Sequence, residues 1–93
     1  MSFDDFEVVA CKVLAYLYAC LKEGVYPDVD EARDLTRVNE VYFGAVVSSM
    51  ISDGLVTGST ILDARGSVVD ICNLTLTLEG AAYLRDNSAT VLL

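Results

Sequence analysis

The chain has 93 residues, of which 54% are hydrophobic, and its fourteen acids against six bases give a net charge of −8. A chain of this length forms one compact domain around one core. The excess of acids repels phosphate backbones and anionic lipids at long range, so the composition argues against casual binding to either. The longest nearly apolar run, Val8–Leu21, has fourteen residues and includes Lys12. A membrane span needs about 20 residues, so we expect none here.

The apolar fraction exceeds the ~45–50% that is usual for a soluble domain. A small domain with this composition leaves some apolar side chains on its surface, which favours a binding partner or self-association over an isolated monomer. The alternative reading is a core that is unusually rich in apolar residues.

The residues that carry chemistry are few. The N-terminus shows acids where a secretory signal has bases, and the three cysteines, Cys11, Cys20 and Cys72, are odd in number. They indicate a reduced, cytoplasmic protein with structural cysteines. The chain has no histidine to activate a nucleophile. We therefore expect no enzyme, no metal site and no cofactor.

The densest acids, Asp28, Asp30, Glu31 and Asp34, do not match a calcium loop, because Ala32 and Arg33 occupy its fifth and sixth positions. We interpret these acids as helix caps and as charges that favour a helix N-terminus.

Three helices are predicted first. Ser2 and Asp5 cap a helix that Gly24 ends, and its apolar residues lie on nearly every side. Such a helix is either central or has a second face against another chain. Asp28 with Glu31 opens a short helix over about residues 29–35. Asn39 caps a third helix that ends at Asp53–Gly54.

The hydrophobic period then changes to that of strands. Residues 55–61 and 68–76 alternate and are rich in β-branched side chains, with Asp63–Gly66 as the turn of a hairpin. Thr77 caps a last helix to about Asp86, with Asn87 as its stop, and residues 89–93 form an apolar tail. Val25–Tyr26 is predicted to supply a short third strand. This order predicts an α+β winged helix-turn-helix fold, with one domain over residues 1–88.

Two segments resemble those of a known family. Phe43-Gly-Ala-Val-Val-Ser-Ser-Met-Ile-Ser-Asp-Gly54-Leu-Val resembles the third-helix signature of winged-helix proteins, and Leu76-Thr-Leu-Glu-Gly80-Ala-Ala-Tyr-Leu84 resembles the return from their wing into the closing helix. With Asn39 and Asp86-Asn-Ser88, they are similar to the small YjcQ-like proteins of Gram-positive bacteria and their phages. The resemblance covers about residues 5–88. It implies the fold and a prophage or other mobile-element origin, and no activity. The first helix is more apolar than in the family.

Winged-helix proteins commonly place their third helix in the major groove of DNA. Residues 39–53 contain neither Lys nor Arg, and Arg37 and Arg65 are the bases nearest to the usual footprint. A strong binder makes about six to ten phosphate contacts. We therefore expect no strong binding of nucleic acid. A DNA-binding transcriptional regulator that uses Arg37 and Arg65 is the alternative.

The leading hypothesis is a module that works through protein contacts, as a homodimer or with a basic protein partner. The outward face of the third helix is predicted to be smooth and uncharged, and tyrosines are enriched at interfaces. The candidate interface residues are Tyr16, Tyr18, Tyr42, Ala45, Ser48 and Ser52.

Overall fold

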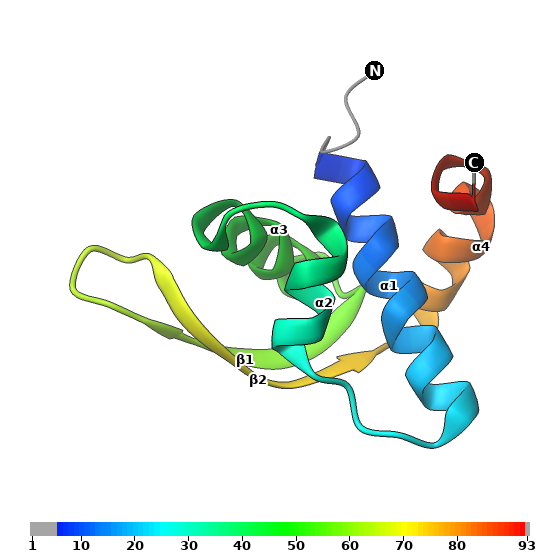
Figure 1. Ribbon diagram of the computed structural model, residues 1–93, viewed down its shortest axis with the longest axis horizontal. Coiled ribbons are helices and arrows are strands. Elements are labelled where there is room, and N and C mark those ends of the chain that lie inside the picture. The colour runs from blue at the N-terminus through cyan, green and yellow to red at the C-terminus, as the bar shows by residue number, and fades with distance from the viewer. Residues whose placement is uncertain (1–5, 93) are drawn as a thin grey trace.

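The computed structural model describes the backbone of residues 6–92 and the side chains of residues 6–87. Helices α1 (Phe6–Glu23), α2 (Val29–Thr36) and α3 (Glu40–Ser52) come first, followed by strands β1 (Val56–Leu62) and β2 (Val68–Leu76) and helix α4 (Leu78–Leu92). Figure 1 shows the three-helix unit with the hairpin projecting from it as a wing. This order confirms the predicted α+β winged-helix fold. The predicted cap at Ser2 lies outside the described residues.

Three helices begin where the sequence places their caps. The Asp28 side chain accepts a hydrogen bond from the Asp30 amide at 2.9 Å, and the Asn39 side chain accepts one from Tyr42 at 2.8 Å. Thr77 does the same for the amide of Gly80 at 3.0 Å. Each cap gives a partner to an amide that the first helical turn leaves unbonded. These local signals fix the entry points of α2, α3 and α4.

Helix α1 is the centre of the domain. It lies between α4 on one side and α2 with α3 on the other (Figure 1), and it also contacts β2. Its buried residues are Val8, Val9, Ala10, Cys11, Val13, Leu14, Leu17 and Cys20. Of the two explanations for an apolar helix, the central position accounts for these residues without a second chain.

The wing packs its inner face on this helical unit. The antiparallel register runs from Val56 opposite Leu76 to Leu62 opposite Val68. The register shifts between Thr57 and Ser59, where Asn73 adopts the left-handed backbone conformation with φ 57°. Such a bulge bends the strand and increases its twist. The side chains of Val56, Ile71 and Leu74 are buried in the common core.

The predicted third strand at Val25–Tyr26 is wrong. Within the described residues the sheet has two strands, and no residue from 25 to 28 belongs to either. The Val25 amide donates to the carbonyl of Cys20 at 3.0 Å, as part of the turn that ends α1. Pro27 has no amide hydrogen. The segment therefore retains too few donors to continue a ladder, and Tyr26 projects into solvent with 98% of its surface exposed.

The predicted end of the last helix near Asp86 is also wrong, because α4 continues to Leu92. Asn87 does not adopt the left-handed conformation that a helix stop requires; Arg37 and Asn73 are the non-glycine residues with positive φ in the described part of the chain. Its side-chain amide instead donates to the Tyr83 carbonyl one turn earlier, at 2.9 Å. That bond lies along the helix and lets α4 pass this position.

Candidate interaction surfaces

Helix α3 is oriented as its sequence predicts. Phe43, Val46, Val47 and Met50 are buried in the core. Ala45 and Ser52 are exposed on the outward side and Ser48 is half-buried. Val41, at 71% exposure, is the largest apolar side chain presented there. From Glu40 to Ser52 the helix has no Lys or Arg, so its outward face presents apolar and small side chains and no cation.

The two arginines near this face lie in different elements. Arg37 is the left-handed C-cap of α2, with φ 58°, and its side chain is exposed in the turn that precedes α3. Arg65 is exposed at the tip of the wing, where its amide donates to the side chain of Asp63 at 2.8 Å. This bond to the backbone closes the turn and places an acid two residues before the arginine at the wing tip.

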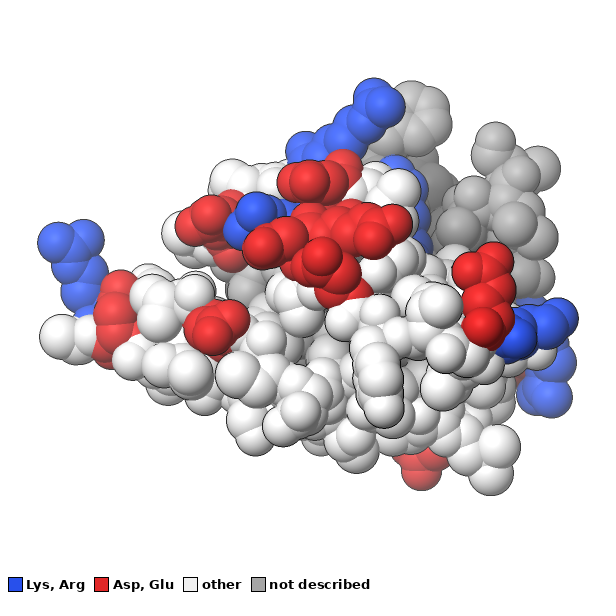
Figure 2. All heavy atoms as spheres, turned by 60° about the horizontal axis from the view of Figure 1, so that its bottom comes forward, with Lys and Arg blue, Asp and Glu red and all other residues white. Residues whose placement is uncertain are grey.

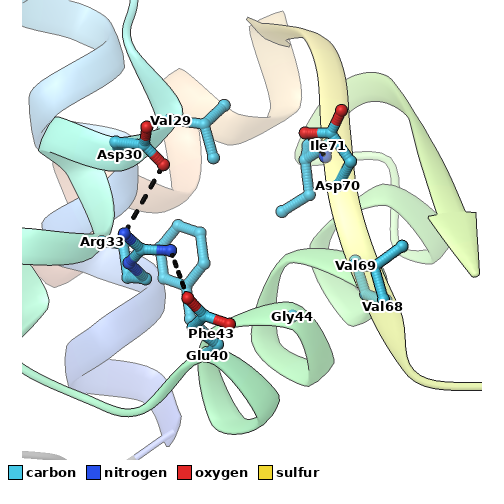
Figure 3. Close-up of a pocket in the computed structure, with 10 residues that line it drawn as sticks. All are labelled: Val29, Asp30, Arg33, Glu40, Phe43, Gly44, Val68, Val69, Asp70 and Ile71. Atoms are coloured by element: carbon cyan, nitrogen blue, oxygen red, sulfur yellow. Dashed lines mark hydrogen bonds and ion pairs between the residues drawn. The ribbon is translucent and has the colours of Figure 1, made fainter.

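Arg33, in α2, is the second arginine of the helix-turn-helix, and it is paired with two acids. Its guanidinium lies 3.0 Å from the Glu40 carboxylate and 3.5 Å from that of Asp30 (Figure 3). This places Arg33 across the junction between α2 and α3. Its charge is offset by two carboxylates and cannot serve a phosphate without breaking those pairs.

Next to this junction is a small cavity of about 70 Å³. It lies in the angle between α2, α3 and the wing, and Figure 3 shows the carboxylates of Asp30, Glu40 and Asp70 around it. Figure 2 shows acidic side chains gathered over the region of α2. Residues 28–53 contain six acids and two bases. The surface that flanks the third helix is therefore anionic.

The three candidate tyrosines occupy different places. The Tyr16 hydroxyl accepts from the Asp28 amide at 2.9 Å and donates to Glu31 at 3.3 Å, which ties α1 to the start of α2. Burial is the main cause that raises the pKa of Tyr16 above its ordinary value. Tyr16 thus has a role inside the chain.

Tyr18 is 45% exposed, with the Lys22 ammonium 5.5 Å from its ring centroid. Tyr42 is half-buried, and its ring centroid lies 6.2 Å from that of Phe6 at the start of α1. Phe6 and Tyr18 are separated by about 18 Å along α1, given the helical rise per residue. Tyr18 and Tyr42 therefore do not share one small patch.

The cysteines lie mainly in the interior. All three are free; Cys11 and Cys20 are buried and Cys72 is half-buried. Burial, with a smaller contribution from Glu7, raises the pKa of the Cys11 thiol, which disfavours the nucleophilic thiolate. Among the described residues no group of three or more His, Cys, Asp and Glu side chains could hold a metal ion. In the same part of the chain, no helix combines the length and the apolar character that a membrane crossing needs.

The sequence reasoning missed a larger, apolar groove of about 370 Å³. It lies between the end of α1, the α1–α2 loop and β2, and its lining residues are Leu17, Cys20, Leu21, Gly24, Val25, Tyr26, Pro27, Leu74, Thr75 and Leu76. The run Val25-Tyr26-Pro27 was the available signal, since two apolar residues stand there beside a helix stop. The pattern predicts a strand, and the structure instead makes this run one wall of the groove.

The three-helix unit, the hairpin after its third helix and the closing helix define a winged-helix domain. A family model described as YjcQ protein matches residues 11–91. The chain therefore belongs to the YjcQ family, as the two sequence motifs indicate. Searches of curated proteins and of solved structures found no match.

Proposed function

We propose that this domain is a non-enzymatic, cytoplasmic module that acts through protein contacts and self-association, and that it does not read DNA. The observation that carries the proposal is the outward face of α3, which has no cation from Glu40 to Ser52 and exposes Val41. In a groove-reading domain, this face supplies contacts to bases and phosphates.

The surroundings of α3 favour the same conclusion. Arg33, in the first helix of the helix-turn-helix, is paired with Asp30 and Glu40. Phosphate binding depends on cations that displace counterions from the duplex. A surface with carboxylates around α2 instead favours a basic protein partner, because complementary charge raises the rate of encounter.

A transcriptional regulator that uses Arg37 and Arg65 is the second candidate, because both side chains are exposed in the turn and at the wing tip. Retention on immobilised duplex DNA, measured at several salt concentrations, tests it. Salt-dependent retention of the wild type that is lost in the Arg37→Ala/Arg65→Ala double variant would favour this candidate over the proposal.

Self-association is tested by light scattering of the full chain across a dilution series. We expect the weight-average mass to rise from that of one chain toward that of two as concentration increases. A constant mass of one chain up to high micromolar concentration would contradict self-association. The proposal would then be limited to contact with a different protein.

A further inference from the structure

One edge of the wing is unpaired. Strand β2 bonds to β1 on one side, and within the described residues no strand lies on the other. The Thr77 amide donates to the Leu55 carbonyl at 3.2 Å, which makes these two residues a hydrogen-bonded pair of the ladder. Antiparallel ladders alternate bonded and non-bonded pairs. It follows that the backbone groups of Thr75 face β1, whereas the carbonyl of Leu74 and both backbone groups of Leu76 face the open edge; the Leu74 amide follows the bulge at Asn73 and is not fixed by this alternation.

This edge borders the apolar groove. Leu74, Thr75 and Leu76 form one wall, and Gly24–Pro27 forms the other. Beside it, three apolar side chains are exposed: Tyr26 at 98%, Leu21 at 56% and Val25 at 51%. An edge strand with unsatisfied backbone groups next to apolar surface is a template for another strand.

The distribution of charge indicates which protein supplies the strand that pairs with this edge. A second copy of this chain also carries −8, so two copies repel unless they meet away from their acids. In Figure 2 the acids gather over α2, whereas the surface below them, over the hairpin and the α1–α2 loop, is mostly uncharged. A basic partner is drawn to the first of these surfaces and gains no charge complementarity on the second.

The edge is also self-complementary. In an antiparallel pair about a two-fold axis at Thr75, Leu74 of one copy faces Leu76 of the other, so the Leu76 amide of each copy can donate to the Leu74 carbonyl of its partner. The two wings then form one four-stranded sheet. The exposed Tyr26 and Val25 of each copy are covered in the same step.

We propose that the free edge of β2, with the groove beside it, is the surface through which two copies of this chain associate. The inference rests on the self-association proposed above and assigns it to a surface other than α3.

Two substitutions that add the same charge at exposed positions separate these surfaces. Tyr26→Asp places a carboxylate beside the groove, and Val41→Asp places one on α3; both side chains are largely exposed, at 98% and 71%. Circular dichroism verifies that both variants fold. In sedimentation equilibrium of the full chain, we expect Tyr26→Asp to raise the dissociation constant of the dimer about tenfold or more, and Val41→Asp to change it less than about threefold.

Amide hydrogen exchange gives an independent readout on the wild type. The amide of Leu76 is expected to exchange more slowly as protein concentration rises, whereas that of Thr75, bonded to β1, stays constant. Protection of the Leu76 amide that does not depend on concentration would show that Val25–Tyr26 closes on β2 within one chain and would overturn the inference.

A dimer that dissociates in Val41→Asp and persists in Tyr26→Asp would also overturn it, while the proposed self-association would stand on α3. A wild type that stays monomeric would contradict both the proposed self-association and its assignment to the β2 edge. An apolar strand of another protein on this edge would slow exchange of the Leu76 amide only when that protein is added, and that result would likewise contradict a second copy as the occupant.

Discussion

At the scale of single residues, Thr77 shows why the Leu76–Leu84 motif is characteristic of this fold. Its hydroxyl oxygen lies 2.6 Å from the Gly54 carbonyl and 2.8 Å from that of Leu55, and it accepts from the Gly80 amide. A Cβ at Gly80 would collide with the Leu55 carbonyl. One side chain thus joins the end of α3, the start of the wing and the start of α4.

Replacing Thr77 with Val, which keeps the shape and removes the hydroxyl, is expected to lower the free energy of unfolding by about 1–3 kcal/mol. The reason is that the half-buried Gly54 carbonyl and the Gly80 amide in the first turn of α4 lose a partner, whereas the Leu55 carbonyl keeps the Thr77 amide. Thr77→Ser is the matched control, because it keeps the hydroxyl. Urea denaturation measures both variants, and an equal loss in the two would contradict a role for the hydrogen bonds.

The buried Cys11 thiol and the half-buried Tyr83 hydroxyl predict a loss of stability in alkali. Burial is the main cause that raises the pKa of each group above its ordinary value in the folded chain. A pKa that is higher in the folded chain than in the unfolded chain means that folding favours the neutral group. The contribution of that group to stability is complete below the pKa of the unfolded chain and is lost as pH rises through the pKa of the folded chain. The free energy of unfolding is expected to decline from about pH 9 upward.

Cys11→Ala tests the contribution of the thiol to this decline. The variant loses packing at neutral pH, since Cys11 is 1% exposed, but its stability is expected to fall less steeply between about pH 8 and about pH 10. Urea unfolding across that range measures the slope. A slope that is unchanged or steeper in the variant would exclude Cys11 as a cause.

At the scale of elements, the contact between α3 and the wing is tight at one point. A Cβ on the buried Gly44 would lie 2.9 Å from Cβ of Val68 at the start of β2. Such a distance requires one element to move, and overpacking of this kind costs about 1–3 kcal/mol. The glycine in mid-helix is thereby explained by the closeness of the strand.

A double-mutant cycle checks this explanation. Gly44→Ala is expected to destabilise the wild type, and to stabilise a Val68→Gly background by up to about 1 kcal/mol, because alanine is the better helix former once the clash is gone. Thermal or urea unfolding of the four proteins gives the coupling. Destabilisation of equal size in both backgrounds would show that the strand does not constrain Gly44.

The elements also separate what the sequence can predict from what it cannot. The caps at Asp28, Asn39 and Thr77 and the turn at Asp63–Gly66 were predictable, because each depends on a side chain that bonds within four residues. The Val25–Tyr26 strand was not, because whether an apolar pair joins a sheet depends on the path of the chain after α1. The sequence alone likewise could not tell that Asn87 bonds along α4.

The candidate site was predictable to a similar degree. Helical spacing correctly placed Ala45 and Ser52 outward and Phe43 inward. It did not reveal that Tyr16 bonds to the start of α2, nor that Arg33 is held by Glu40 from the next helix. Those contacts, and the groove beside β2, arise only when distant segments pack together.

At the scale of the whole molecule, charge sets opposite salt dependences for the two functional hypotheses. Two copies that each carry −8 repel, and salt screens that repulsion over about 8–10 Å at 0.1–0.15 M. Self-association is therefore expected to strengthen as sodium chloride is raised from about 0.05 M to about 0.5 M. Light scattering at fixed protein concentration measures it, and a dimer that weakens over this range would indicate that charge attraction holds it together.

The central claim is that a fold known for reading grooves here presents a third helix without cations. Fluorescence anisotropy of labelled mixed-sequence duplexes, titrated with the full chain at physiological salt, tests it most directly. We predict no saturable change in anisotropy up to high micromolar protein. Saturable binding with a sub-micromolar dissociation constant, reduced in the Arg37→Ala/Arg65→Ala variant, would contradict the account.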